Sequence, residues 1–190
     1  VCATGIDSVT KEMRNRAKAV NVGIIYGMSE YGLSRDIKVS RNEAKMYIEN
    51  YFARYSGVQR YIKETIENAR KNGFVTTILK RRRYLPDLFS SNRNTRNFGE
   101  RTAVNTPIQG SAADIIKLAM VNLDHKLKEK KFKAKMVLQV HDELIFDVPA
   151  NELRDLKELV KDSMENAINL KVPLIVDLKA GNNWYDVEKI

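Results

Sequence analysis

The sequence predicts an α+β protein in which amphipathic helices accompany a small antiparallel sheet. Apolar residues recur at helical spacing in three regions, at residues 40–71, 98–130 and 153–168. Between the last two regions lies the stretch MVLQVHDELIFDV at residues 136–148. Its two short apolar runs flank a compact polar centre, and Val, Ile and Phe favour strands. This stretch is therefore predicted to form a β-hairpin.

Length and composition describe a soluble globular chain. Its 190 residues suffice for one ordinary domain or two small lobes, with 43% hydrophobic and 30% charged residues. No apolar run approaches the roughly 20 residues that span a bilayer, and no secretory signal is evident. Cys2 is the only cysteine, which excludes an internal disulfide. Because the first residue is Val1, we expect the natural chain to extend upstream.

The net charge of +9 favours a polyanionic partner, above all nucleic acid. Basic residues cluster at residues 14–18, 80–83 and 126–135. Each cluster could contact phosphates, or it could form an ordinary solvated surface.

The first predicted helix begins after a cap at Ser8 or Thr10 and ends near residue 26. Gly23 and Gly27 are costly in a helix, which suggests close approach to the backbone. Residues spaced by four form a slowly winding stripe on one side of a helix. Such a stripe could hold phosphates and a flat base, or it could be a solvated face. Its members are Arg14, Lys18, Val22 and Tyr26.

Two further helices are predicted, one opened by a capping box of Ser40 and Glu43 and one ended by Gly73. A strand at residues 74–79, a hairpin corner at residues 80–83 and a loop at residues 90–97 follow.

The long helical region at residues 98–130 is expected to be interrupted at Pro107 and Gly110. Ahead of this break, a row of donors and acceptors recurs every four residues, which suits a nucleic-acid groove or an ordinary helix surface. The row consists of Arg101, Asn105 and Gln109.

Towards the C-terminus, residues 172–178 are predicted to add a third strand to the hairpin's sheet. Trp184 and Tyr185 are expected to anchor the C-terminus against the core.

The polar centre of the hairpin consists of His141, Asp142 and Glu143, which we expect to form its turn. Carboxylate oxygens are preferred ligands of Mg²⁺, which takes one or two of them from protein. An acidic surface turn without a ligand is an equal alternative on these residues alone.

Three stretches, taken together, resemble the polymerase region of the family A DNA polymerases. They are RNRAKAVNVGIIYG at residues 14–27, NTPIQGSAADIIKLAM at 105–120 and QVHDELIFDVP at 139–149. The resemblance implies a helical fingers lobe at about residues 8–97. It also implies a C-terminal palm segment at about residues 98–190, with part of an antiparallel palm sheet carrying a catalytic hairpin. The upstream palm, the thumb and any exonuclease domain are expected to lie outside this chain.

The resemblance implies that Arg14 and Lys18 hold the triphosphate of a dNTP and that Lys18 also acts on the leaving group. Position 22 faces the nucleotide sugar, and Val22 departs from the Phe or Tyr that is usual in the family. Tyr26 corresponds to the tyrosine that stacks on the template.

The row on the long helix corresponds to residues that touch primer–template DNA near the minor groove. By the same resemblance, Asp142 is a catalytic metal-binding carboxylate, His141 lies against the primer end and Glu143 supports the site. Arg82 and Arg83 are expected to contact the DNA backbone.

The implied chemistry is phosphoryl transfer at a site of two Mg²⁺ ions. The family's other catalytic Asp lies in a DYSQIELR-like stretch that this chain lacks, so one carboxylate is expected from outside the chain. We therefore expect the chain alone to be inactive and to need the remaining upstream polymerase segment. No membrane partner is expected. The cytoplasm of a bacterium or of a phage-infected cell is the expected location, with an organelle left open.

Two other functions remain open on the sequence. One is a module that binds primer–template DNA or nucleotide without chemistry. The other is a metal-dependent nuclease built around His141 and Asp142, which no further cluster of Asp, Glu and His supports.

Overall fold

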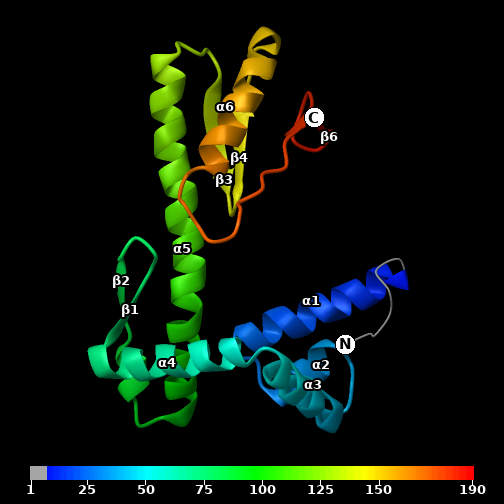
Figure 1. Cartoon of the computed structure of the whole chain (residues 1–190), viewed down its shortest axis with the longest axis vertical. Helices are drawn as coiled ribbons and strands as arrows, with labels where there is room; N and C mark the ends of the chain where they lie inside the picture. Colours follow the sequence, from blue (N-terminus) through cyan, green and yellow to red (C-terminus); the bar gives the residue numbers. More distant parts are fainter. Residues whose placement is uncertain (1–7) are drawn as a thin grey trace. The chain divides into compact units, whose positions relative to one another are not determined.

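The structure, a computed structural model, describes residues 8–190 and consists of two compact units that divide between Ile108 and Gln109 (Figure 1). In chain order the elements are α1 (Lys11–Ile25), α2 (Glu30–Asp36), α3 (Arg41–Arg54), α4 (Ser56–Asn72), β1 (Phe74–Thr76), β2 (Arg82–Tyr84), the 3₁₀ helix η2 (Pro86–Phe89), α5 (Arg93–Glu129), β3 (Lys135–Val140), β4 (Glu143–Asp147), the 3₁₀ helix η3 (Ala150–Glu152), α6 (Leu153–Glu165), β5 (Lys179–Ala180) and β6 (Glu188–Lys189).

Helices α1 to α3 begin at side-chain caps. Thr10 Oγ1 accepts a hydrogen bond from the Met13 N–H, and Ser40 forms the predicted capping box with Glu43. Hydrogen bonds from Ser40 lower the pKa of the Glu43 carboxyl. The three helices share an apolar cluster, whose buried members are Leu33, Ile37 and Ala44.

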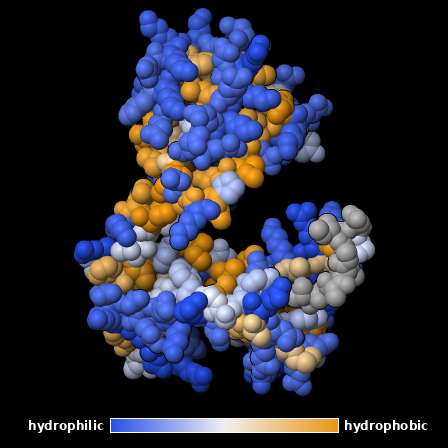
Figure 2. All heavy atoms as spheres, viewed as in Figure 1, coloured by the Kyte–Doolittle hydropathy of each residue, from blue (hydrophilic) through white to orange (hydrophobic). Residues whose placement is uncertain are grey.

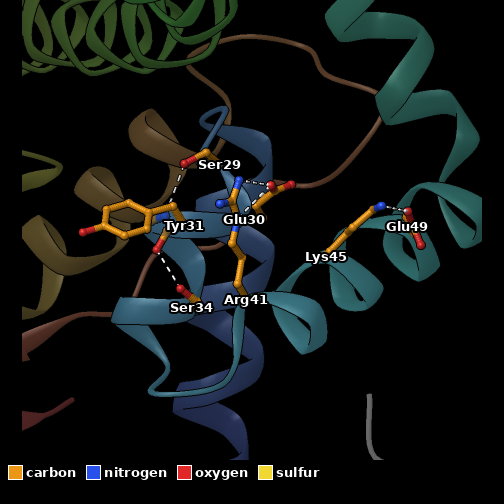
Figure 3. Close-up of polar contacts among 8 residues, drawn as sticks. Ser29, Glu30, Tyr31, Ser34, Arg41, Lys45 and Glu49 are labelled. Atoms are coloured by element: carbon orange, nitrogen blue, oxygen red, sulfur yellow. Dashed lines mark hydrogen bonds and ion pairs between the residues drawn. The ribbon is translucent and has the colours of Figure 1, made fainter.

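Polar side chains also connect α2 and α3 (Figure 3). Arg41 donates two hydrogen bonds to Glu30 Oε1, at 3.0 and 2.6 Å. Ser29 caps α2 by accepting a hydrogen bond from the Gly32 N–H. Arg41 and Glu30 are both substantially exposed, so their ion pair adds little to stability, and the apolar cluster contributes more.

The β1–β2 hairpin is shorter than predicted. Helix α4 ends at Gly73, whose φ of 79° is left-handed as expected for a C-terminal cap. Strand β1 stops at Thr76 rather than at residue 79, because Thr77 accepts a hydrogen bond from the Arg81 N–H and closes the corner. Arg82 and Arg83 therefore lie in β2 instead of in the corner.

The segment predicted as a loop at residues 90–97 instead contains the start of α5. Asn92 Oδ1 accepts hydrogen bonds from the N–H groups of Asn94 and Thr95 and so caps the start of α5. The polar composition of this segment had predicted a loop. Helix α5 also continues through Pro107 and Gly110 without the predicted break. Pro107 removes one backbone hydrogen bond. Apolar side chains of α5 are buried both before and after Pro107, such as Val104 and Leu123, and their burial favours the helix on both sides of it.

The second unit packs β3, β4 and α6 against the C-terminal half of α5. Strands β3 and β4 are antiparallel, and Val137 has no partner of its own in the register, which marks a β-bulge. The core shared by these elements has the following buried members: Leu123, Leu127, Ala134, Leu156, Leu159 and Val160. Met136, Leu144 and Phe146 of the hairpin pack against it.

Two predictions for the C-terminal segment are wrong. Residues 172–178 form no strand, and β5 pairs only with β6, in a sheet of its own. Trp184 and Tyr185 are 56% and 93% exposed instead of buried against the core. In the described part of the chain, the sheets are three two-stranded antiparallel hairpins, so the protein is mostly helical.

The surface is predominantly hydrophilic on the face shown in Figure 2. None of the helices within residues 8–190 is both long and apolar enough to cross a bilayer.

Glu152 holds the connection between α5 and β3. Its carboxylate accepts hydrogen bonds from the Lys133 N–H at 3.0 Å and from the Ala134 N–H at 2.9 Å. Ala134 is only 5% exposed.

Glu152→Ala leaves a buried donor unsatisfied and should lower the free energy of unfolding by about 1–3 kcal/mol, measured by urea denaturation. Glu158→Ala removes an exposed carboxylate of α6 and is the control, with an expected change within about 0.5 kcal/mol. Equal losses in the two variants would contradict the role of Glu152.

Candidate functional site

Helix α1 is buried on one side and open on the other. Ala19 and Val20 pack against the apolar cluster of α2 and α3. Arg14 and Lys18 are exposed, and their side chains make no hydrogen bond or ion pair with any residue from 8 to 190. Val22, which follows on the same stripe, is 39% exposed. The predicted stripe is therefore available to a ligand along most of its length.

Two polar contacts connect α1 to its neighbours. An Arg16 guanidinium nitrogen donates to the Ile37 carbonyl at 3.3 Å. The Tyr51 hydroxyl of α3 donates to Asn21 Oδ1 at 2.7 Å. The Arg16 side chain is thus hydrogen-bonded within the protein, whereas Arg14 and Lys18 have no such bond with a described residue.

The C-terminal end of α1 lies against the N-terminal part of α5. Gly27 has a φ of +74°, and a Cβ atom there would lie 3.1 Å from Arg101 Cγ. Tyr26, which precedes it, is half-buried. Within the first unit, the structure therefore brings the end of the stripe close to the first residue of the predicted row.

The remaining residues of that row differ in their surroundings. Asn105 is half-buried, and its Oδ1 atom is buried without a hydrogen-bond partner among the described residues. Gln109 is exposed and is the first residue of the second unit. Because that oxygen is shielded from solvent, it is an unsatisfied acceptor within the first unit, and its burial without a partner costs free energy.

Arg82 and Arg83 both have partners within the first unit. The Arg82 guanidinium lies 4.7 Å from the centre of the Phe74 ring, in a cation–π contact. Arg83 donates to Thr106 Oγ1 at 3.4 Å, and the same hydroxyl donates to the Thr102 carbonyl at 2.7 Å. These contacts hold both arginines close to the protein surface.

The tip of the β3–β4 hairpin has a two-residue turn, so the prediction that all three polar residues form the turn is wrong. The turn is His141 and Asp142, while Glu143 is the first residue of β4 and pairs with Val140. His141 has a φ of +53°, the sign that tight hairpin turns require at their first central residue. All three polar side chains are exposed.

Gln139 is a contributor that sequence reasoning missed. Its Nε2 atom donates to the His141 carbonyl oxygen at 2.6 Å and so bridges the turn from within β3. A side-chain amide two residues before a non-glycine turn is the signal that could have indicated it.

The carboxylates at the tip have no partner among residues 8–190. The Asp142 side chain makes no hydrogen bond or ion pair with another described residue. No three His, Cys, Asp or Glu side chains between residues 8 and 190 converge as a metal-ligand set. The adjacent, exposed carboxylates of Asp142 and Glu143 fit a hard divalent cation such as Mg²⁺, whose remaining ligands would come from outside this turn.

Comparison with known proteins places the chain in a class of nucleic-acid polymerases. The chain belongs to DNA polymerase family A, whose family model matches residues 1–186. The resemblance of the three sequence stretches is thereby confirmed.

Among its relatives, the chain is similar to DNA polymerase I of Caldicellulosiruptor bescii, with 55% identity over 99% of this chain and 22% of that protein. It is 53% identical to DNA polymerase I of Bacillus subtilis, over 96% of this chain and 21% of the relative. The chain thus spans about a fifth of the length of these relatives.

A solved structure is similar as well. The POL domain of Pol1 from M. smegmatis, in complex with DNA primer-template and dNTP, matches with a TM-score of 0.87 and 50% identity. The match covers 90% of this chain and 30% of that one.

Gly27 tests the contact between α1 and α5. Gly27→Ala places a Cβ atom against Arg101 and forces a left-handed conformation on a residue with a side chain. We expect a loss of about 1–2 kcal/mol in the free energy of unfolding, measured by urea denaturation. Gly57→Ala is the matched control, because nothing lies within 4 Å of the added atom and its φ is ordinary. It should be neutral or stabilising, and a Gly27→Ala variant as stable as Gly57→Ala would show that the contact is absent.

Proposed function

We propose that this chain is part of a DNA polymerase that transfers nucleotides from dNTPs to a primer 3′-hydroxyl under the direction of a template. The observation that carries the proposal is the open stripe of α1. Its cations have no partner in the described protein, while the opposite side of the same helix is packed. Family membership and the similarity to a polymerase structure with bound primer-template and dNTP support it.

In this proposal α1 binds the incoming nucleotide. Arg14 and Lys18 attract the triphosphate with charge-assisted hydrogen bonds. Lys18 also stabilises the charge that develops on the leaving pyrophosphate. Val22 contacts the sugar, and the ring of Tyr26 stacks at the insertion position.

The row on α5 and His141 contact primer–template DNA. Arg101, Asn105 and Gln109 approach the minor groove, where acceptors are similar for all base pairs. Such contacts can test the shape of a pair without reading its sequence. Arg82 and Arg83 contribute backbone contacts, and each must first give up or share its partner on the protein.

Asp142 is the metal-binding carboxylate of this chain, and Glu143 supports it from the start of β4. Bound Mg²⁺ would activate the primer hydroxyl and neutralise charge on the phosphates. One carboxylate supplied from outside the chain completes the site. Asp142 presents its oxygens from a hairpin whose opposite face is packed on the core of the second unit.

We further assign about residues 8–97 to a fingers lobe and about residues 98–190 to a C-terminal palm segment that carries the catalytic hairpin in part of an antiparallel palm sheet. The upstream palm and the thumb then belong to the remainder of the enzyme, and the cytoplasm of a bacterium is the proposed location. The chain's extent of about a fifth of its relatives supports a role as one part of a larger enzyme.

Primer extension tests the proposal. With Mg²⁺ and four dNTPs, the chain should extend a primer only when mixed with a separately produced upstream segment carrying the missing catalytic Asp. Asp142→Asn should abolish the extension, because it removes a metal-binding charge while keeping the shape of the side chain. Asp147→Asn is the control, an exposed carboxylate at the other end of β4.

Two results would count against this assignment. Extension by the chain alone would refute the need for an outside carboxylate. Salt-sensitive DNA binding with no extension in the mixture would favour a binding module without chemistry.

Val22 is predicted to weaken nucleotide binding and alter sugar selectivity. A Val22→Phe variant adds apolar surface beside the sugar and should tighten dNTP binding by up to about tenfold. Its discrimination between deoxy and dideoxy nucleotides should change as well, measured by single-nucleotide incorporation in the mixture. Val121→Phe, at an exposed position of α5 in the second unit, controls for a general effect of added apolar surface. Unchanged affinity and selectivity in Val22→Phe would show that position 22 does not face the sugar.

A further inference from the structure

Apolar packing sets which side of α1 is buried, since Gly23 and Ile24 are buried, but it does not fix small rotations of the helix about its own axis. The helix contacts the cluster of Leu33, Ile37 and Ala44 through small side chains such as Ala19 and Val20. Apolar contact is non-directional. A small rotation keeps Ile24 on the packed side of the helix and still changes the direction in which the stripe points.

Directional contacts are what select one rotation. Of the two side-chain hydrogen bonds that join α1 to other described segments, the one from Tyr51 to Asn21 is the shorter, at 2.7 Å against 3.3 Å for Arg16. Asn21 lies between Lys18 and Val22 in the sequence, so a shift at Asn21 moves both stripe residues.

Tyr51 is suited to act as a fixed point. It is 8% exposed, and its ring lies 5.8 Å from that of Phe52 and 4.9 Å from that of Tyr55. Burial raises the pKa of the Tyr51 phenol, which therefore remains protonated and able to donate at neutral pH. The hydroxyl thus projects from a packed ring at a defined position.

We propose that Asn21 and Tyr51 are a positioning pair, in which the Tyr51 hydroxyl holds α1 at the rotation that turns Arg14, Lys18 and Val22 toward the incoming nucleotide. The inference rests on the proposed function and extends it to two residues that do not themselves touch the nucleotide. It predicts an effect on nucleotide affinity that is separate from catalysis.

Tyr51→Phe tests the pair because it removes the hydroxyl and keeps the packed ring. We expect dATP to bind the full chain about threefold to tenfold more weakly, the range of one net hydrogen bond, measured by isothermal titration calorimetry. In the mixture with the upstream segment, the KM for dATP should rise by the same factor with kcat unchanged.

Matched variants separate positioning from general destabilisation. Tyr47→Phe removes a hydroxyl from the same helix, and the Tyr47 hydroxyl makes no hydrogen bond with a described residue. It should leave dATP affinity unchanged. Asn21→Ala should reproduce the loss, and the double variant with Tyr51→Phe should be no weaker than either single variant.

The outcomes distinguish this inference from the proposed function. If the wild-type chain binds dATP and Tyr51→Phe binds it equally well, the positioning pair is refuted and the proposed function stands. Equal losses in Tyr51→Phe and Tyr47→Phe would also refute the pair. If the wild-type chain neither binds dATP nor extends a primer in the mixture, the proposed function fails and the inference fails with it.

Discussion

The side on which α1 is buried determines what the first unit presents to a ligand. Cations on a helix are ordinarily solvated or paired, and Arg16 shows the second case through its contact with the Ile37 carbonyl. Arg14 and Lys18 show the first case, exposed and without a partner among the described residues, because the apolar cluster of α2 and α3 takes the opposite side of the helix. Two unpaired cations on one stripe raise the local positive potential, which is how a protein surface attracts a phosphate group.

In the second unit, too, one element is packed on a core and leaves polar side chains exposed, here the β3–β4 hairpin. Side chains of the β3–β4 hairpin pack on the core that α5 and α6 share, while the residues of its turn are exposed. His141 adopts a left-handed conformation that costs free energy in a residue with a side chain. The paired strands and the Gln139 hydrogen bond offset that cost. The Asp142 carboxylate is exposed and makes no hydrogen bond with another described residue.

Several apolar side chains that would ordinarily lie in a core are exposed in the second unit. Ile175 and Tyr185 are 81% and 93% exposed, and Val137 at the bulge is 56% exposed. Single exposed apolar side chains are ordinary on a protein surface, so these residues by themselves identify no interface.

The sequence by itself predicted α1, α3, α4 and α6, the caps at Thr10 and Ser40, the β3–β4 hairpin and the family, but it missed α2 and the start of α5. These features depend on residues close together in the chain, such as Thr10 with Met13 or Ser40 with Glu43. They also depend on the periodic spacing of apolar residues, which can be read directly from the sequence. The roles proposed for Asp142 and for the stripe also came from the sequence, through the family resemblance, and they remain proposals.

Only the tertiary structure decided the rest. Helix α5 continues through Pro107, and apolar side chains that favour it are buried both before and after the proline. Residues 172–178 form no strand, since β-propensity requires a neighbouring strand to pair with and β3–β4 does not supply one there. The contact of Gly27 with Arg101 and the hydrogen bond of Tyr51 with Asn21 join residues far apart in the sequence. No local pattern encodes such pairs, because they exist only once the helices have packed.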